Sequence, residues 1–231
     1  MIKYLSLFSG IGAFEKALEN LSIPYELVGY CEIDKYASKA YSIIHNVPES
    51  LNFGDITLIN EKQLPKDIDL VTYGFPCQDI SLAGKQKGFE DENGNKTRSG
   101  LFFDALRIIE ECRPQIAIAE NVKNLTGKRF TEQFNIVLNS LESAGYNNYW
   151  KVLNAKDYEI PQNIEKIGVT DYWIIFSEVT ERGDNVGYFI IGALCFISGL
   201  AMGVFLTALI VAGADDNIGE VNELGDDENE L

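Results

Sequence analysis

The chain has 231 residues, of which 46% are hydrophobic, and this allows one large domain or one domain plus an appendage. Its formal net charge of −16 argues against a generic nucleic-acid coat protein, although half of that charge comes from eight acidic residues in 215–231. The four cysteines form no closely spaced pair and there is one histidine, His45, so no zinc-binding pattern is present.

Strands and helices alternate in the first two thirds of the sequence. The pattern predicts strands at 3–8, 25–31, 69–73, 115–119 and 148–153, and helices near 14–21, 35–45, 101–112 and 131–144, the last ending at Gly145. This order predicts an α/β fold, in which a mostly parallel sheet carries helices on both faces. We expect His45 to be a surface residue at a helix end.

The composition changes in the last third of the chain. Residues 187–213 form a run of 27 residues without a charge, which is long enough for one C-terminal transmembrane helix. Gly199 and Gly203 form one GxxxG pair, typical of packed membrane helices but also expected from the abundance of glycine in them. Arg182 on the N-terminal flank weakly favours a cytoplasmic location for the preceding domain. The acidic tail, 214–231, is predicted to be disordered.

A glycine-rich turn and two carboxylates predict a binding site for a nucleoside-like cofactor. The sequence Phe8-Ser9-Gly10-Ile11-Gly12 links a strand to a helix, and its glycines let a ligand approach the backbone. Glu32 follows the second strand and is suited to hydrogen-bond ribose hydroxyls. Asp55 is suited to an exocyclic amine, although an ordinary turn aspartate is an equally good interpretation of that residue alone.

The sequence Gly74-Phe75-Pro76-Cys77-Gln78 follows a buried strand and presents a thiol at the carboxyl edge of the sheet. Pro76 fixes the local backbone and with it the direction of Cys77. A lone cysteine in such a place is more often a small buried residue. Glu120 ends the next strand and would face the same edge, which favours a functional role over that of a turn acid.

These segments resemble cytosine-C5 DNA methyltransferases over residues 1–163. The matching segments are FSGIGAFE at 8–15, CEIDKYA at 31–37, GDIT at 54–57, GFPCQDIS at 74–81, RSGLFFDALRI at 98–108, ENV at 120–122 and NAKDYEIPQN at 154–163. Their order and spacing also match. The resemblance implies a Rossmann-like, S-adenosylmethionine-dependent methyltransferase sheet that acts on double-stranded DNA, typically in restriction–modification.

The resemblance also assigns roles to individual residues. Cys77 would attack C6 of a flipped-out cytosine, and Glu120 would hydrogen-bond the N3 side of the ring. The residues assigned to catalysis are Pro76, Cys77, Gln78 and Glu120. The residues assigned to S-adenosylmethionine are Phe8, Gly10, Gly12, Glu32, Ile33, Asp55 and Leu101. The residues assigned to a mobile loop that contacts DNA phosphates are Ser81, Lys85, Lys87 and Arg98; an ordinary solvated loop is the alternative.

The sequence departs from the family pattern after Asn163. The family usually has Arg-x-Arg where this chain has Ile164-Glu165-Lys166, and a lysine cannot reproduce the planar fork of an arginine. We divide the chain into an incomplete catalytic domain (1–163), a linker (164–186), the membrane helix and the tail. No target-recognition domain is expected in the remaining residues, so we predict weak activity for the chain alone.

Three interpretations remain open. The chain is the catalytic half of a methyltransferase completed by a second chain, a truncated or fused gene product anchored in a membrane, or a membrane-tethered cofactor-binding module. In each, the methyltransferase-like part is placed in the cytoplasm, because no signal peptide is visible at its start and its thiols are free.

Overall fold

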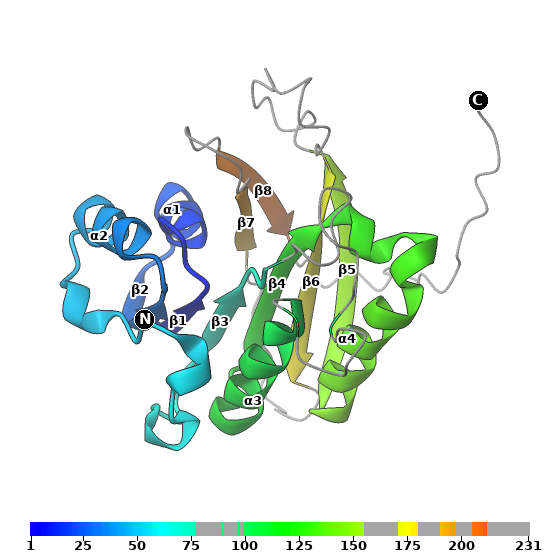
Figure 1. The fold of residues 1–231 in the computed structure, drawn as a ribbon. Helices are drawn as coiled ribbons and strands as arrows, with labels where there is room; N and C mark the ends of the chain where they lie inside the picture. The colour runs from blue at the N-terminus through cyan, green and yellow to red at the C-terminus, as the bar shows by residue number, and fades with distance from the viewer. Residues whose placement is uncertain are drawn as a thin grey trace.

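The computed structural model describes residues 1–76, 89, 97 and 99–154, and it gives the strands at 171–179, 190–196 and 205–211 as backbone only, as it does Asn154. Within these ranges a six-stranded sheet has the strand order β2-β1-β3-β4-β6-β5 (Figure 1). The strands are β1 (Ile2–Leu7), β2 (Tyr25–Cys31), β3 (Leu70–Tyr73), β4 (Ile116–Val122), β5 (Tyr146–Asn154) and β6 (Asp171–Val179).

The first four strands of the sheet are parallel. β1 pairs with β2 on one side and β3 on the other, and β3 pairs with β4. The connection therefore reverses direction between β1 and β3, which is where ligands bind in open α/β sheets. β6 runs antiparallel between β4 and β5. The predicted α/β fold with a mostly parallel sheet is confirmed.

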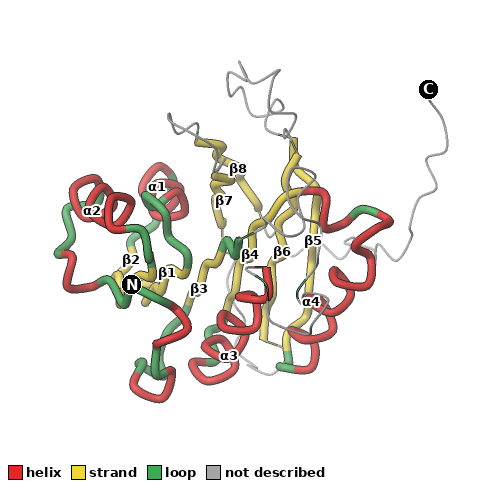
Figure 2. Tube along the Cα trace, in the orientation of Figure 1, coloured by secondary structure: helices red, strands yellow, loops and turns green. Residues whose placement is uncertain are grey.

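Four α-helices occur in the described part of the chain, as the sequence predicts: α1 (Ala13–Asn20), α2 (Lys35–Ile44), α3 (Phe102–Cys112) and α4 (Thr131–Ser143). Figure 2 shows these helices, in red, beside the yellow strands, together with short 3₁₀ turns. Asp34 caps α2 by accepting hydrogen bonds from the N–H groups of Tyr36 and Ala37. Gly145 follows α4 with a φ of 87°, as a glycine after a helix end does.

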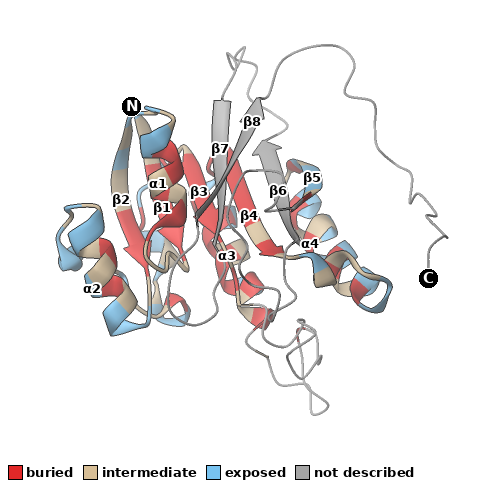
Figure 3. Cartoon of the chain, turned by 90° about the horizontal axis from the view of Figure 1, so that it is seen from above, coloured by how far each residue is buried: buried red, intermediate tan, exposed pale blue. Residues whose placement is uncertain are grey.

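Alternate side chains of β1 show which helices cover which face. Leu5 and Leu7 belong to the main core, which also contains residues of α3 and α4. Tyr4 points the other way, because its hydroxyl donates to Glu15 of α1 over 3.1 Å. The sheet is therefore a middle layer, with α1 on one face and α3 and α4 on the other, and its inner strands β1, β3 and β4 are buried (Figure 3).

The predicted linker, 164–186, contains part of the main sheet. β6 lies within it and pairs with Ile116–Val122 along one edge and with Tyr146–Asn154 along the other. This strand was not predicted because the last recognisable motif segment ends at Asn163. The strand nevertheless has the apolar composition of a buried one, as Trp173-Ile174-Ile175-Phe176 shows.

The single helix predicted over 187–213 is not found, and this part of the prediction is corrected. The described parts of that run are two antiparallel strands, β7 (Ile190–Phe196) and β8 (Phe205–Val211), which pair in a separate two-stranded sheet. Short apolar runs rich in Ile, Val and Phe fit strands as well as helices, and periodicity alone does not separate the two. Across the residues that the structure describes, no helix is long and apolar enough to cross a membrane.

Candidate active site

The parallel strands bring the predicted cofactor and catalytic segments to one edge of the sheet. Residues 8–12 follow the carboxyl end of β1, residues 32–33 follow β2, and residues 74–76 follow β3. Glu120 lies within β4 (Ile116–Val122), two residues before the end of the strand. Since β1 to β4 are parallel and adjacent, these segments are neighbours although they are far apart in the sequence.

The glycine turn has an unusual backbone. Phe8, Gly10 and Gly12 have φ values of 55°, 55° and 88°, in the left-handed region that favours glycine. The N–H of Gly10 donates to Glu32 Oε2 over 2.8 Å, which ties the turn to the end of β2. A Cβ added at Gly10 would meet no described atom within 4 Å. As far as the described residues show, the turn leaves open space at Gly10, whose N–H binds the Glu32 carboxylate.

The side chain of His45 packs against this turn, so the prediction that His45 is a surface residue is wrong. It does lie at the end of α2, but its side chain is only 1% exposed. Its Nε2 donates to the carbonyl oxygen of Ile11 over 3.0 Å, and its Nδ1 lies 3.1 Å from a carboxylate oxygen of Glu19. A Cβ at Gly12 would come within 2.0 Å of His45 Nε2. The ring therefore fills the space that a glycine at position 12 leaves.

Two further predicted cofactor residues lie beside the turn. The N–H of Asp34 donates to Glu32 Oε1 over 2.7 Å, so the backbone holds both oxygens of this carboxylate in place. The side chain of Ile33 is 74% exposed, which leaves an apolar surface next to Glu32. An exposed isoleucine beside a fixed carboxylate suits a ligand with an apolar ring and a hydroxylated sugar.

Asp55 and Leu101 come from other elements. Asp55 begins a 3₁₀ turn, Ile56–Leu58, where its Oδ1 accepts hydrogen bonds from the N–H and the hydroxyl of Thr57 over 2.9 and 2.8 Å. Leu101 precedes α3 and packs against the main core. Ile56–Leu58 lies against α3, which brings the two segments together.

The predicted catalytic segments contact each other directly. The side-chain amide of Asn121 donates to the carbonyl oxygen of Phe75 over 2.9 Å, and Asn121 is 2% exposed. Glu120 lies against Gly74, because a Cβ added at Gly74 would come within 3.1 Å of Glu120 Oε2. The residues immediately before Cys77 are therefore fixed against the end of β4. The sequence analysis did not assign a role to Asn121, although it lies within the ENV segment.

The environment of Glu120 changes its acidity. Burial raises the pKa of Glu120 to about 8, and no positive side chain offsets this effect within the described residues. Most Glu120 carboxyl groups therefore carry a proton at about pH 7. A protonated carboxyl group donates a hydrogen bond, whereas a carboxylate only accepts one.

Six of the predicted site residues lie outside the described residues: Cys77, Gln78, Ser81, Lys85, Lys87 and Arg98. The same holds for Ile164-Glu165-Lys166. Two other thiols are described, and burial raises the pKa of Cys31 to about 12 and that of Cys112 to about 11. Both thiols are buried in the core and neither is suited to act as a nucleophile. Among the described residues no cluster of potential metal ligands occurs.

Comparisons with known proteins agree with this arrangement. The sequence profile of the family described as C-5 cytosine-specific DNA methylase matches residues 2–169. The orphan methyltransferase M.Rho11sI of Bacillus phage rho11s is 46% identical over 188 residues, which cover 80% of this chain and 36% of that protein. The type II methyltransferase M.HhaI of Haemophilus parahaemolyticus is 42% identical over 167 residues, which cover 72% of this chain and 47% of that protein.

The fold is also found in solved structures. The crystal structure of the Schizosaccharomyces pombe Dnmt2 methyltransferase superposes with a TM-score of 0.54 at 23% identity, and the match covers 80% of this chain and 53% of that one. The chain thus spans about a third to a half of the length of the curated relatives it matches. Because the family profile covers most of this sequence and the site segments meet at one edge of the sheet, the chain belongs to the C-5 cytosine-specific DNA methylase family.

Proposed function

We propose that this chain transfers a methyl group from S-adenosylmethionine to C5 of cytosine in double-stranded DNA. The observation that carries the proposal is the direct link between the two catalytic segments: Asn121 binds the carbonyl of Phe75, and Glu120 lies against Gly74. This link places a protonated carboxyl group beside the segment that leads to Cys77.

The residues at the cofactor edge fit S-adenosylmethionine. Glu32 is fixed by two backbone N–H groups, and the space beside Gly10 is open among the described residues. We propose that Glu32 accepts hydrogen bonds from the ribose, Ile33 flanks the adenine, and Asp55 accepts one from the adenine amine. The bound cofactor supplies an electrophilic methyl group.

In the proposed mechanism, the Cys77 thiolate adds to C6 of the cytosine and makes C5 electron-rich. Glu120 donates its proton to N3, so the charge that develops on the ring is stabilised. After methylation, water takes the C5 proton and its bonding electrons form the C5–C6 double bond while the C6–S bond breaks and releases the Cys77 thiolate. N3 returns its proton to Glu120, which restores the base and the enzyme. The target base must leave the duplex, because its C6 is inaccessible within the stack.

Two properties of the chain extend the proposal. The first is weak activity of the chain alone, which is supported by Ile164-Glu165-Lys166, where the family pattern has Arg-x-Arg. In this proposal, a second chain that carries a recognition surface completes the enzyme. Cytoplasmic placement of the catalytic domain, with attachment to a membrane through 187–213, is supported by the absence of charge in that run. The paired strands β7 and β8 argue against a helical span there. Fractionation of cells in alkaline carbonate tests the attachment: an integrally attached chain stays in the membrane pellet, and an unattached chain is released.

The central test is covalent trapping on DNA. A duplex containing 5-fluorocytosine, whose fluorine cannot be eliminated as a proton can, is expected to trap the chain in the presence of cofactor. Cys77→Ser is expected to abolish the adduct. Cys112→Ser serves as a matched control, because Cys112 is a buried thiol at the last residue of α3. Trapping that persists in Cys77→Ser would contradict the assignment. Trapping needs only a single turnover, which weak activity allows. Robust, repeated transfer of tritiated methyl groups to ordinary duplex DNA by the chain alone would contradict the predicted weak activity.

A further inference from the structure

The turn formed by residues 54–57, here called the Asp55 turn, contributes one side chain to the main core. Ile56 is 4% exposed, but it is the only buried residue in this turn, and the following Leu58 is 80% exposed. The 3₁₀ helix that follows Asp55 is three residues long. Such a short element depends on polar contacts with its neighbours for a fixed position.

Asn52 holds the Asp55 turn on its N-terminal side. Its Oδ1 accepts hydrogen bonds from the N–H of Glu32 over 3.0 Å and from that of Gly54 over 2.8 Å. Its Nδ2 donates to the carbonyl of Glu32 and to Ser38 Oγ, each over 2.8 Å. Two backbone donors face one end of the amide and a carbonyl faces the other, which fixes its orientation. One side chain therefore connects Glu32 to the Asp55 turn.

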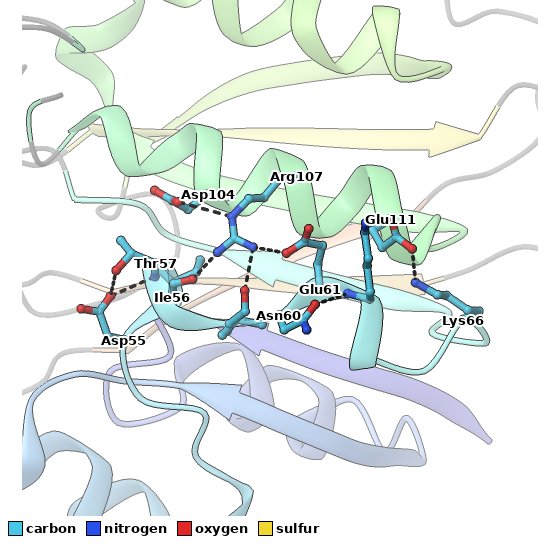
Figure 4. Close-up of polar contacts among 11 residues, drawn as sticks. Asp55, Ile56, Thr57, Asn60, Glu61, Lys66, Asp104, Arg107 and Glu111 are labelled. Atoms are coloured by element: carbon cyan, nitrogen blue, oxygen red, sulfur yellow. Dashed lines mark hydrogen bonds and ion pairs between the residues drawn. The ribbon is translucent and has the colours of Figure 1, made fainter. Parts of the chain in front are cut away.

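Arg107 of α3 holds the same turn on its C-terminal side (Figure 4). Its Nη2 donates to the carbonyl of Ile56 over 2.5 Å, and its Nη1 donates to the carbonyl of Ile59 over 2.9 Å and to Glu61 Oε2 over 2.5 Å. Its Nε lies 3.4 Å from Asp104 Oδ1, one turn earlier on the helix. The planar guanidinium reaches two carbonyls at once, which a lysine ammonium cannot do with the same geometry.

Neither residue is placed to meet a ligand itself. The amide of Asn52 is already bonded to four groups, and the Arg107 guanidinium faces backbone carbonyls and two carboxylates. Asp55, by contrast, uses only Oδ1 in contacts with described residues, which leaves Oδ2 as an acceptor. The group that would bind a ligand and the groups that hold it in place are thus different residues.

We propose that Asn52 and Arg107 are positioning residues that fix the distance between Glu32 and Asp55, and thereby set the affinity for the adenosine end of the cofactor. The inference rests on the proposed function, since it takes S-adenosylmethionine as the ligand. It adds that the affinity for the adenosine end depends on two residues whose polar groups are bonded to the protein itself.

The test measures binding of S-adenosylhomocysteine to the full chain by titration calorimetry. Arg107→Lys and Asn52→Ala are each expected to weaken binding by about tenfold, as the loss of one or two hydrogen bonds would. Glu61→Gln, which disturbs only the outer contact of Arg107, is expected to weaken it by about two- to threefold. Arg129→Lys and Asn20→Ala are matched controls on exposed sites of other elements and are expected to bind like the parent.

A double-mutant cycle separates positioning from general stability. Asp55→Asn keeps the Oδ1 contact with Thr57 but removes the second carboxylate oxygen. If Arg107 acts through Asp55, then Arg107→Lys has little further effect on binding in the Asp55→Asn background. Additive losses would contradict the inference. Hydrogen exchange of the ligand-free chain gives a second readout, in which Arg107→Lys is expected to speed exchange in 54–63 and to leave β1 unchanged.

The outcomes for the inference and for the proposed function are distinct. Binding by the parent, together with parent-like binding by Arg107→Lys and Asn52→Ala, would overturn the inference and leave the proposed function intact. No binding by the parent would overturn both. If Arg107→Lys does not fold, Asn52→Ala and Glu61→Gln still decide, because each removes a different contact with the turn.

Discussion

Replacing Glu120 by glutamine tests whether its carboxyl group is protonated in the folded chain. Burial raises the pKa of Glu120 to about 8 from an ordinary value of 4.5. Between these two values the folded state keeps a proton that the unfolded state releases. The free energy of unfolding of the parent therefore has its full value below pH 4.5 and falls as the pH rises through about 8.

The size of this effect follows from the two pKa values. Each pH unit between them is worth about 1.4 kcal/mol, so the difference between 4.5 and about 8 corresponds to about 5 kcal/mol. Glu120 is partly exposed as a residue, so water screens the ionised form and lowers this figure. As the pH rises from about 5 to about 8, we expect the free energy of unfolding of Glu120→Gln to rise by about 2–3 kcal/mol relative to that of the parent. The reason is that glutamine does not ionise.

Urea denaturation followed by circular dichroism measures this difference at a series of pH values. Glu110→Gln is the matched control, since Glu110 lies on an exposed position of α3 and is expected to show no such gain. Parallel stability curves for the parent and Glu120→Gln across the whole range would refute the reasoning. The same result would remove the protonated donor from the proposed mechanism.

Three other predictions concern the supporting structure. Gly12→Ala is expected to destabilise the chain and weaken cofactor binding. Adding His45→Ala is expected to restore part of the loss, because it removes the 2.0 Å clash and leaves about 1–2 kcal/mol of backbone strain. No rescue in the double variant would argue against the contact. Iodoacetamide is expected to leave Cys31 and Cys112 unmodified until the chain unfolds, because burial raises the pKa of both thiols, and peptide mapping by mass spectrometry checks this. A chain that ends after Asn163 lacks β6 and is expected to lose its cooperative thermal transition, whereas one that ends after residue 186 retains it.

The positions of the strands and helices along the chain could be predicted from the sequence, because each element carries a local signal. The apolar runs that became β1 to β4 and the amphipathic patterns of α1 to α4 are each visible within a window of a few residues. The closeness of the glycine turn to Glu32 could be predicted because parallel topology brings strand ends together. The main error in position among these elements is the end of β4, where Glu120 continues the strand.

The contacts that hold the site could not be predicted because they depend on distant partners. Asn52 connects groups 2 to 20 residues away along the chain, and Arg107 reaches a segment 46 to 51 residues away. His45 shows the same limit, since its contact with Ile11 spans 34 residues. Asparagine, arginine and histidine are common on surfaces, and nothing in their neighbouring residues distinguishes a surface position from one inside a network.

The strand β6 shows why the last recognisable motif is a poor guide to the edge of a domain. Along one side β4 pairs with β3, and along the other it pairs with β6, so removal of β6 would expose the backbone of β4 next to Glu120. An exposed edge there would admit water to a carboxyl group whose raised pKa depends on burial. The backbone of β6 therefore covers the edge of β4 beside Glu120 as well as extending the sheet. Because β6 pairs with both β4 and β5, the main sheet continues past Asn163, beyond the residues that carry the recognisable motifs.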